Sequence, residues 1–328
     1  MKKQITKIAA FVFAALMILS ALSGCAGKTE KADKKVSVVC TIFPIYDWVR
    51  NLVGDRASEV DIKMLIDNGV DLHNFQPAAD DIVAVSDCDI FIYVGGESDK
   101  WVDDVLATAG NKDMKVIDLL SVLGDKIKEE EVKDGMEAEE EHEEGEEEGP
   151  EYDEHVWLSL KNAVAICKSI NEALCAADPE GKEVYTANWI KYSEQLATLE
   201  FSYQYKLLTP EKKTLVFADR FPFRYLLDDY GIDYYAAFVG CSTESEASFE
   251  TIVFLAKKLD ELGLKHVIVI EGTEHKIAES VIANTEKKDM DILTLDSMQG
   301  ITSSGADDGL TYLSIMENNL KVLEQALN

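Results

Sequence analysis

Short apolar runs rich in β-branched residues alternate along the chain with segments whose apolar positions recur every three or four residues. The run at 36–43, VSVVCTIF, is followed by IYDWVRNLVGD, in which Ile45, Trp48 and Leu52 recur at helical spacing. The same order of elements repeats up to the strand pattern MKVIDLL, and a second series begins with KTLVFA at 213–218. Alternating strands and helices predict parallel sheets covered by helices on both faces.

A longer apolar stripe separates the two series. Asp178 and Pro179 suit the cap and the first position of a helix, and the segment continues to Pro210. Within it, aromatic and leucine residues follow one another at steps of three or four: Tyr185, Trp189, Tyr192, Leu196, Leu199, Tyr203 and Leu207. A helix of this length spans about 40 Å at ~1.5 Å per residue. We therefore expect residues 178–210 to form one long backbone helix.

The predicted fold class is α/β, with two Rossmann-like lobes whose parallel sheets are joined by this helix. Residues 36–177 would form the N-terminal lobe and residues 211–328 the C-terminal lobe. Open parallel sheets bind ligands at the carboxyl ends of their strands. A cleft between the lobes, lined by loops from those ends, is therefore the expected binding site.

The first residues have the pattern of a secretory signal, because three lysines precede the apolar run IAAFVFAALMIL, which is short for a membrane-spanning helix. The sequence LSGC at 22–25 is a lipobox, in which the cysteine thiol receives a diacylglycerol. We expect residues 1–24 to be a lipoprotein signal peptide and Cys25 to be the lipidated anchor. Residues 25–35 would then be a polar tether on the outer face of the cell membrane.

The chain is strongly acidic, with 62 acidic and 32 basic residues and a formal net charge of −30. This charge would repel nucleic-acid phosphates and is compatible with cation binding. Much of it lies in the run Glu129–Glu154, where Lys133 is the only basic residue. Because such a run buries too little apolar surface to fold, we expect residues 129–152 to be a disordered insertion.

Five cysteines follow Cys25, and none of them lies in a C-x-x-C motif. An odd, scattered set is neither a disulfide framework nor a zinc finger. We interpret them mainly as small buried apolar residues and leave pairing open: Cys40, Cys88, Cys167, Cys175 and Cys241.

Several ionisable side chains stand where a predicted strand ends or a predicted helix begins. His73 follows the strand DIKMLI, and His155 precedes the helix WLSLKNA. In the second series three carboxylates end strands and one histidine begins a helix: Asp219, Glu271, Asp296 and His275. Imidazoles with carboxylates form a ligand set for zinc or manganese rather than for copper(I). These side chains could converge on one metal site in the cleft.

Four motifs together carry a resemblance that covers the chain from about Val36 to the C-terminus. They are Pro44 after the first strand, DNGVDLHNFQPAADDI, DEHVWLSLKNA and LDSMQG. In these motifs the sequence resembles the zinc- and manganese-binding solute-binding lipoproteins of ABC importers, the ZnuA/TroA type. The resemblance implies His73 and His155 as the first two metal ligands and the Asp296 carboxylate as the last. It also implies an extracytoplasmic zinc receptor, without catalysis, that delivers its ion to an ABC permease.

The sequence departs from the family at the third ligand, a His or Glu that the family places within the stretch TLVFADRFPFRYLLDDYG. Counting back from Tyr225 places Arg220 in the ligand position, whereas counting forward along the strand places Ala218 or Asp219 there. The guanidinium of Arg220 offers no lone pair to a metal. We expect Arg220 to pair with a carboxylate such as Asp219. The favoured site is zinc bound by His73, His155, His275 and Asp296, and the alternative is a manganese site that uses Asp219 or Glu271.

Two other classes of function compete with a monomeric metal receptor. A surface metallohydrolase would need an open metal position with an activated water, and a lipid-anchored adhesin would use the same two-lobed body without needing the metal. The sequence holds no H-E-x-x-H motif, no G-x-S-x-G motif and no glycine-rich phosphate loop. We therefore expect a binding protein rather than an enzyme.

Overall fold

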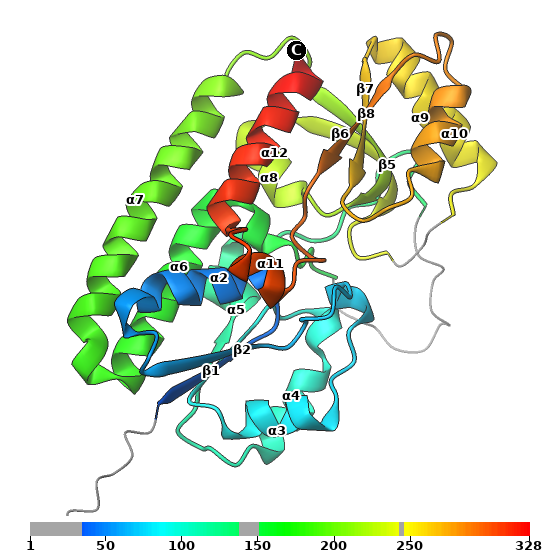
Figure 1. Ribbon diagram of the computed structural model, residues 1–328. Coiled ribbons are helices and arrows are strands. Elements are labelled where there is room, and N and C mark those ends of the chain that lie inside the picture. The colour runs from blue at the N-terminus through cyan, green and yellow to red at the C-terminus, as the bar shows by residue number, and fades with distance from the viewer. Residues whose placement is uncertain (1–34, 138–150, 243–245) are drawn as a thin grey trace, which may run out of the picture. The chain divides into compact units, whose positions relative to one another are not determined.

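The computed structural model (Figure 1) describes three stretches of the chain: residues 35–137, 151–242 and 246–328. Val36–Asn328 form one compact unit, to which the following description applies. The predicted signal peptide, Cys25 and nearly all of the tether lie outside the described residues. Among the residues described, no helix combines the length and the apolar character needed to cross a membrane.

Two parallel four-stranded sheets form the framework, as the alternating pattern predicted. Their strand orders are β2-β1-β3-β4 and β6-β5-β7-β8, so both sheets have the same topology. The strands of the first sheet are β1 Val36–Cys40, β2 Val60–Met64, β3 Ile90–Tyr93 and β4 Lys115–Asp118. Those of the second are β5 Thr214–Phe221, β6 Asp233–Val239, β7 His266–Ile270 and β8 Asp291–Leu295.

The strands are connected by helices, as expected for parallel sheets. The helices before the second sheet are α2 Phe43–Val53, α3 Ala79–Asp87, α4 Trp101–Thr108, α5 Leu119–Leu123, α6 Leu160–Ala177 and α7 Lys182–Lys206. Those that follow are α8 Arg224–Tyr230, α9 Phe249–Leu262, α10 Lys276–Ala283, α11 Ser303–Asp307 and α12 Tyr312–Leu327. Single 3₁₀ turns include η2 Leu72–Asn74, η5 Val156–Leu158 and η6 Pro179–Gly181.

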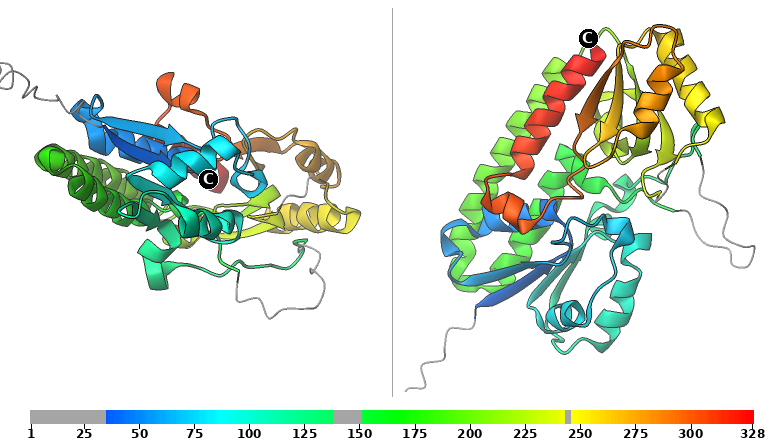
Figure 2. Two further views of the ribbon diagram at one scale, coloured as in Figure 1. Left: turned by 90° about the horizontal axis from the view of Figure 1, so that it is seen from below. Right: turned by 45° about the vertical axis from the view of Figure 1, so that its right-hand side comes forward.

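The predicted backbone helix is present as the 25-residue α7. Asp178 caps the turn η6 by accepting from Gly181 N, and Pro179 is the first residue of that turn, so α7 itself begins at Lys182. Helix α7 packs against α6, α2 and α12, and Figures 1 and 2 show α7 and α12 running side by side. Helix α7 therefore packs on helices that themselves contact the two sheets, α2 and α6 the first and α12 the second.

One hydrophobic core extends through both lobes. The same buried cluster includes Phe91 of the first sheet and Phe217 of the second, together with Trp48, Trp157 and Tyr312. The Tyr312 hydroxyl donates to the Trp157 carbonyl over 2.7 Å, and the Tyr312 ring packs edge-on against Trp48. A smaller cluster fills the space between the second sheet, α9 and α10. The predicted lobe boundaries therefore cross a shared core, and those boundaries stay predictions.

The expectation that residues 129–152 are wholly disordered is wrong at the edges of this segment. The backbone N–H of Glu137 donates to the Ala237 carbonyl over 2.9 Å, which adds the segment to strand β6. Lys133 forms an ion pair with Asp233. Composition missed this because backbone groups of an acidic segment can still pair with a strand edge. The centre of the segment, residues 138–150, lies outside the described residues.

Candidate metal centre

His73 lies in the turn η2, at the carboxyl end of the first sheet. The Asp71 carboxylate accepts from the His73 backbone N–H over 3.0 Å, and the buried residues Leu72 and Phe75 anchor the turn on either side. The His73 side chain is only 5% exposed. A short, capped turn with apolar anchors therefore holds this imidazole in a defined position.

His155 is fully buried immediately before η5. Asp153 fixes it twice, because its Oδ1 accepts from the His155 backbone N–H over 2.9 Å and lies 3.1 Å from Nδ1. The neighbouring Trp157 ring packs against the imidazole with centroids 5.2 Å apart, and the Trp157 indole donates to the Ser297 carbonyl. The motif read from the sequence thus holds His155 between a carboxylate and a buried indole.

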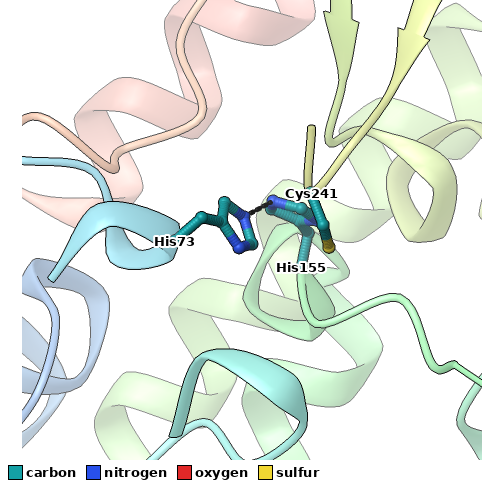
Figure 3. A group of neighbouring side chains, drawn as sticks. All are labelled: His73, His155 and Cys241. Carbon is teal, nitrogen blue, oxygen red and sulfur yellow. Dashed lines mark hydrogen bonds between the residues drawn. The ribbon is translucent and has the colours of Figure 1, made fainter. Parts of the chain in front are cut away.

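The two imidazoles meet at their Nε2 atoms, which lie 3.2 Å apart (Figure 3). Their outer nitrogens have partners, since His73 Nδ1 is 2.8 Å from Ser98 Oγ and His155 Nδ1 faces Asp153. Without a metal the two Nε2 atoms share a hydrogen bond, and with protons on both outer nitrogens instead, both inner lone pairs would be free for a metal. Tetrahedral zinc with Zn–N bonds of ~2.0–2.1 Å would separate two such nitrogens by about 3.3 Å. The pair therefore fits a shared zinc ion.

Burial and the neighbouring His155 and Arg220 lower the pKa of His73 to about 3, although Asp71 acts in the opposite direction. A metal-binding imidazole must be neutral. His73 is therefore ready to bind a cation at neutral pH without first losing a proton.

Glu154 is a buried carboxylate behind His73 that the sequence interpretation did not single out. Its Oε1 accepts from the Ser98 backbone N–H over 2.9 Å, and its Oε2 lies 3.5 Å from His73 Nδ1. Among the described residues, Oε2 has no hydrogen-bond partner. Burial raises the pKa of Glu154 to about 7. Glu154 and Ser98 thus orient the outer face of the His73 ring.

Cys241 is the third potential ligand, and the sequence interpretation missed it. Among the described residues, His73, His155 and Cys241 form the group whose possible metal-binding atoms all lie within 4.8 Å of one another. Figure 3 shows Cys241 next to His155. The sequence held a signal for this residue, because Cys241 follows the carboxyl end of β6, as Glu271 follows the carboxyl end of β7. The composition alone predicts a small buried apolar residue at this position.

The structure does not bring Asp219 into this cluster. Its two carboxylate oxygens accept from the backbone N–H groups of Arg220 and Ile270 over 2.9 and 3.3 Å. Arg220 pairs with a carboxylate as predicted, but the partner is Asp71 rather than Asp219. The Nη2 of Arg220 donates to Asp71 over 2.7 Å.

Glu271, Asp296 and His275 also lie outside the three-residue cluster. Glu271 accepts from the Ser297 backbone N–H and hydroxyl over 2.7 and 2.6 Å, which ties the end of β7 to the loop after β8. Burial and the adjacent Glu271 raise the pKa of Asp296 to about 7. His275 begins α10 with a positive φ of 55°. Their ligand roles stay predictions.

Residues of both lobes line two cavities that share Arg220. One, of about 430 Å³, is lined by Asn74, Arg220 and His275 among others. The other, of about 440 Å³, is lined by Asp71, Arg220 and Glu271 among others. The predicted cleft is thus present as two cavities, and His73 and His155 are not among the residues that line them.

The two α/β lobes and the pair of buried imidazoles define the class of a solute-binding protein with a candidate metal site. A family model described as "Zinc-uptake complex component A periplasmic" matches residues 38–326. The chain belongs to this family, as the motifs had indicated. Its family and relatives are metal-binding solute-binding proteins rather than enzymes, so a metallohydrolase is not favoured.

Two curated zinc-binding proteins are similar in sequence to this chain. The zinc-binding lipoprotein AdcA of Streptococcus pneumoniae is 30% identical over 303 residues, which are 90% of this chain but 56% of AdcA. The chain therefore spans little more than half of that relative. The high-affinity zinc uptake system protein ZnuA of Bacillus subtilis is 30% identical over 97% of this chain and 96% of its own length.

A solved structure agrees in fold. The Zn(II)-bound ZnuA-like domain of Streptococcus pneumoniae AdcA superimposes with a TM-score of 0.69 at 26% identity. The match covers 89% of this chain and 99% of that domain. Nearly the whole of that domain thus has a counterpart here.

Proposed function

We propose that this protein captures zinc between His73 and His155 and supplies it for uptake through an ABC permease. The observation that carries the proposal is the 3.2 Å approach of the two Nε2 atoms. Both rings are oriented from behind by Ser98 and Asp153, an arrangement typical of histidines that bind metal.

The choice of zinc rests on the chemistry of the cluster and on the relatives. Two buried imidazoles form a site that suits zinc, whereas manganese prefers oxygen ligands. The curated relatives are named zinc-binding or zinc uptake proteins. The manganese alternative, in which Asp219 or Glu271 would bind, is not favoured, since both carboxylates are occupied by backbone N–H groups.

We also propose that the protein lies on the outer face of the cell membrane and that an ABC permease is its partner. Lipidated Cys25 would hold the protein on the outer face of the cell membrane as a monomer, with the segment before Val36 as tether. The permease would then receive the ion within reach of that tether. Support comes from the lipobox at 22–25 and from the lipoprotein name of AdcA.

A competition titration of the metal-free protein against a zinc chelator tests the proposal. His73→Ala and His155→Ala should each weaken zinc binding by roughly tenfold or more, because each removes a ligand. His266→Ala is the matched control, since His266 opens β7 outside the cluster and should leave the affinity unchanged. Wild-type affinity in both cleft variants, with the fold intact by circular dichroism, would overturn the proposal.

A further inference from the structure

We infer that Cys241 supplies the third protein ligand to the bound zinc, as a thiolate, in place of the side chain at position 220. The inference rests on the proposed function and specifies the site. Among the described residues, Cys241 completes the group of possible ligands within 4.8 Å of one another. Counted back from Tyr225, Arg220 stands where the family resemblance implies a ligand, and a guanidinium cannot bind a cation.

The chain reaches this position because residue 240 is glycine. A Cβ atom at Gly240 would lie 3.0 Å from His155 Cε1 and 2.8 Å from the Phe221 carbonyl. A side chain there would thus collide with the imidazole on one side and with backbone on the other. The missing Cβ lets the backbone pass directly beside the His155 ring, so the next residue, Cys241, enters the metal site.

Hydrogen bonds hold the loop in this place. The Cys241 backbone N–H donates to Glu130 Oε1 over 3.3 Å, and the Ser242 N–H donates to the Val239 carbonyl over 3.4 Å. Glu130 belongs to the ordered start of the acidic segment, which also pairs with β6 through Glu137. The end of β6 is therefore supported from two directions.

Arg220 acts as a positioning residue in this arrangement. Its Nη1 donates to the Ser242 carbonyl over 3.2 Å, next to Cys241, and its Nη2 donates to Asp71 over 2.7 Å. Asp71 caps the turn that carries His73. One guanidinium thus connects the loops of two ligands across the cleft. An arginine at position 220 supplies no ligand to the metal. Its hydrogen bonds instead hold the two loops that carry His73 and Cys241.

Thiolate coordination has consequences for chemistry and selectivity. When zinc binds, the Zn–S bond forms, the S–H bond breaks and one proton leaves to solvent. A tetrahedral ion with a Zn–S bond of ~2.3 Å needs sulfur and nitrogen about 3.6 Å apart, which is within the 4.8 Å that encloses the three possible ligand atoms. A soft thiolate also strengthens the preference for zinc over manganese.

Cobalt substitution provides a direct test with the full chain. Cobalt(II)-loaded protein should show a thiolate-to-cobalt charge-transfer band in the near ultraviolet, and Cys241→Ser should lose it. The same variant should bind zinc at least about tenfold more weakly in chelator competition. Cys175→Ser is the matched control, because Cys175 is a half-buried free thiol on α6 outside the cluster. It should keep both the band and the affinity.

A double variant separates a ligand from a structural role. Arg220→His in the Cys241→Ser background returns an imidazole to the position where the family usually has a ligand, and should recover most of the lost affinity without restoring the charge-transfer band. If the wild type binds neither zinc nor cobalt, the proposed function itself fails. If it binds both without a thiolate band, and Cys241→Ser binds like wild type, only the present inference fails. If in that case only His275→Ala weakens zinc binding, the result would support the ligand set predicted from the sequence, which includes His275.

Discussion

At the scale of single residues, the site depends as much on the groups behind the ligands as on the ligands. Asp153 accepts from both the backbone N–H and, through the same oxygen, the ring Nδ1 of His155. Such a contact selects the tautomer that leaves Nε2 free for a metal. The side chain of Asp153 is only 3% exposed, so water cannot readily replace it.

Asp153→Ala should therefore weaken zinc binding by about 10–100-fold while both imidazoles remain in place. The measurement is chelator competition, with Asp125→Ala as control, because Asp125 is an exposed carboxylate. An unchanged zinc affinity in Asp153→Ala would mean that Trp157 packing alone orients His155.

Local sequence motifs predicted two of the three clustered side chains, His73 and His155, but not Cys241. His73 and His155 were found because each stands in a motif with a local physical signature, a capped turn or a helix start. Cys241 was missed because its role depends on Gly240 lying against the His155 ring, a contact between segments 85 residues apart that no local pattern records. The carboxylate partner of Arg220 was not predicted, because Asp71 lies 149 positions away in the sequence.

At the scale of elements, hydrophobic periodicity predicted both sheets and α7, because each strand and helix buries one regular set of apolar positions. It could not predict which strand ends become neighbours, since β1 and β5 lie second in their sheets although each comes first in the chain. The carboxyl end of β6, at a sheet edge, reaches the site for this reason.

Asp47 joins three helices and is expected to make stability depend on pH. It lies on α2, accepts from the Tyr312 N–H of α12 over 3.1 Å and faces the Tyr192 hydroxyl of α7. Burial raises its pKa to about 6, above the ordinary 3.8. Between these values the folded state holds more protons than the unfolded state, so this contribution to stability is complete below about pH 4 and is lost as the pH rises through 6.

Asp47→Asn keeps an acceptor for Tyr312 and removes the charge. The variant should raise the free energy of unfolding at pH 7 by up to about 3 kcal/mol, and the difference should vanish near pH 4. Urea unfolding at both pH values measures it. A difference that is the same at both pH values would show that the charge of Asp47 is not responsible.

At the scale of the whole molecule, two observations connect the lobes. Their hydrophobic core is continuous, and the Asp71–Arg220 ion pair crosses the cleft with both side chains only 15% exposed. Interior packing resists continuous deformation. The cleft therefore presents His73 and His155 at nearly their bonding separation before an ion arrives, which lowers the cost of ordering the site.

The start and the centre of the acidic segment, residues 129–152, are expected to affect the metal site differently. Its start, with Glu130 and Glu137, supports the end of β6, whereas residues 138–150 contribute charge to a protein whose net charge is already −30. Replacing 138–150 with an equally long Gly/Ser linker should leave the fold and the zinc affinity within about twofold of wild type at 0.15 M salt, where charges more than ~8 Å apart are screened.

Glu130→Ala is the informative partner of this linker variant, because it removes the acceptor for the Cys241 N–H and should weaken zinc binding severalfold. Capture rates add a second readout. If the carboxylates of 138–150 concentrate cations near the cleft, the linker variant should bind zinc more slowly at low salt and at the wild-type rate at high salt. If the zinc affinity falls in the linker variant but not in Glu130→Ala, the metal site depends on residues 138–150 rather than on Glu130.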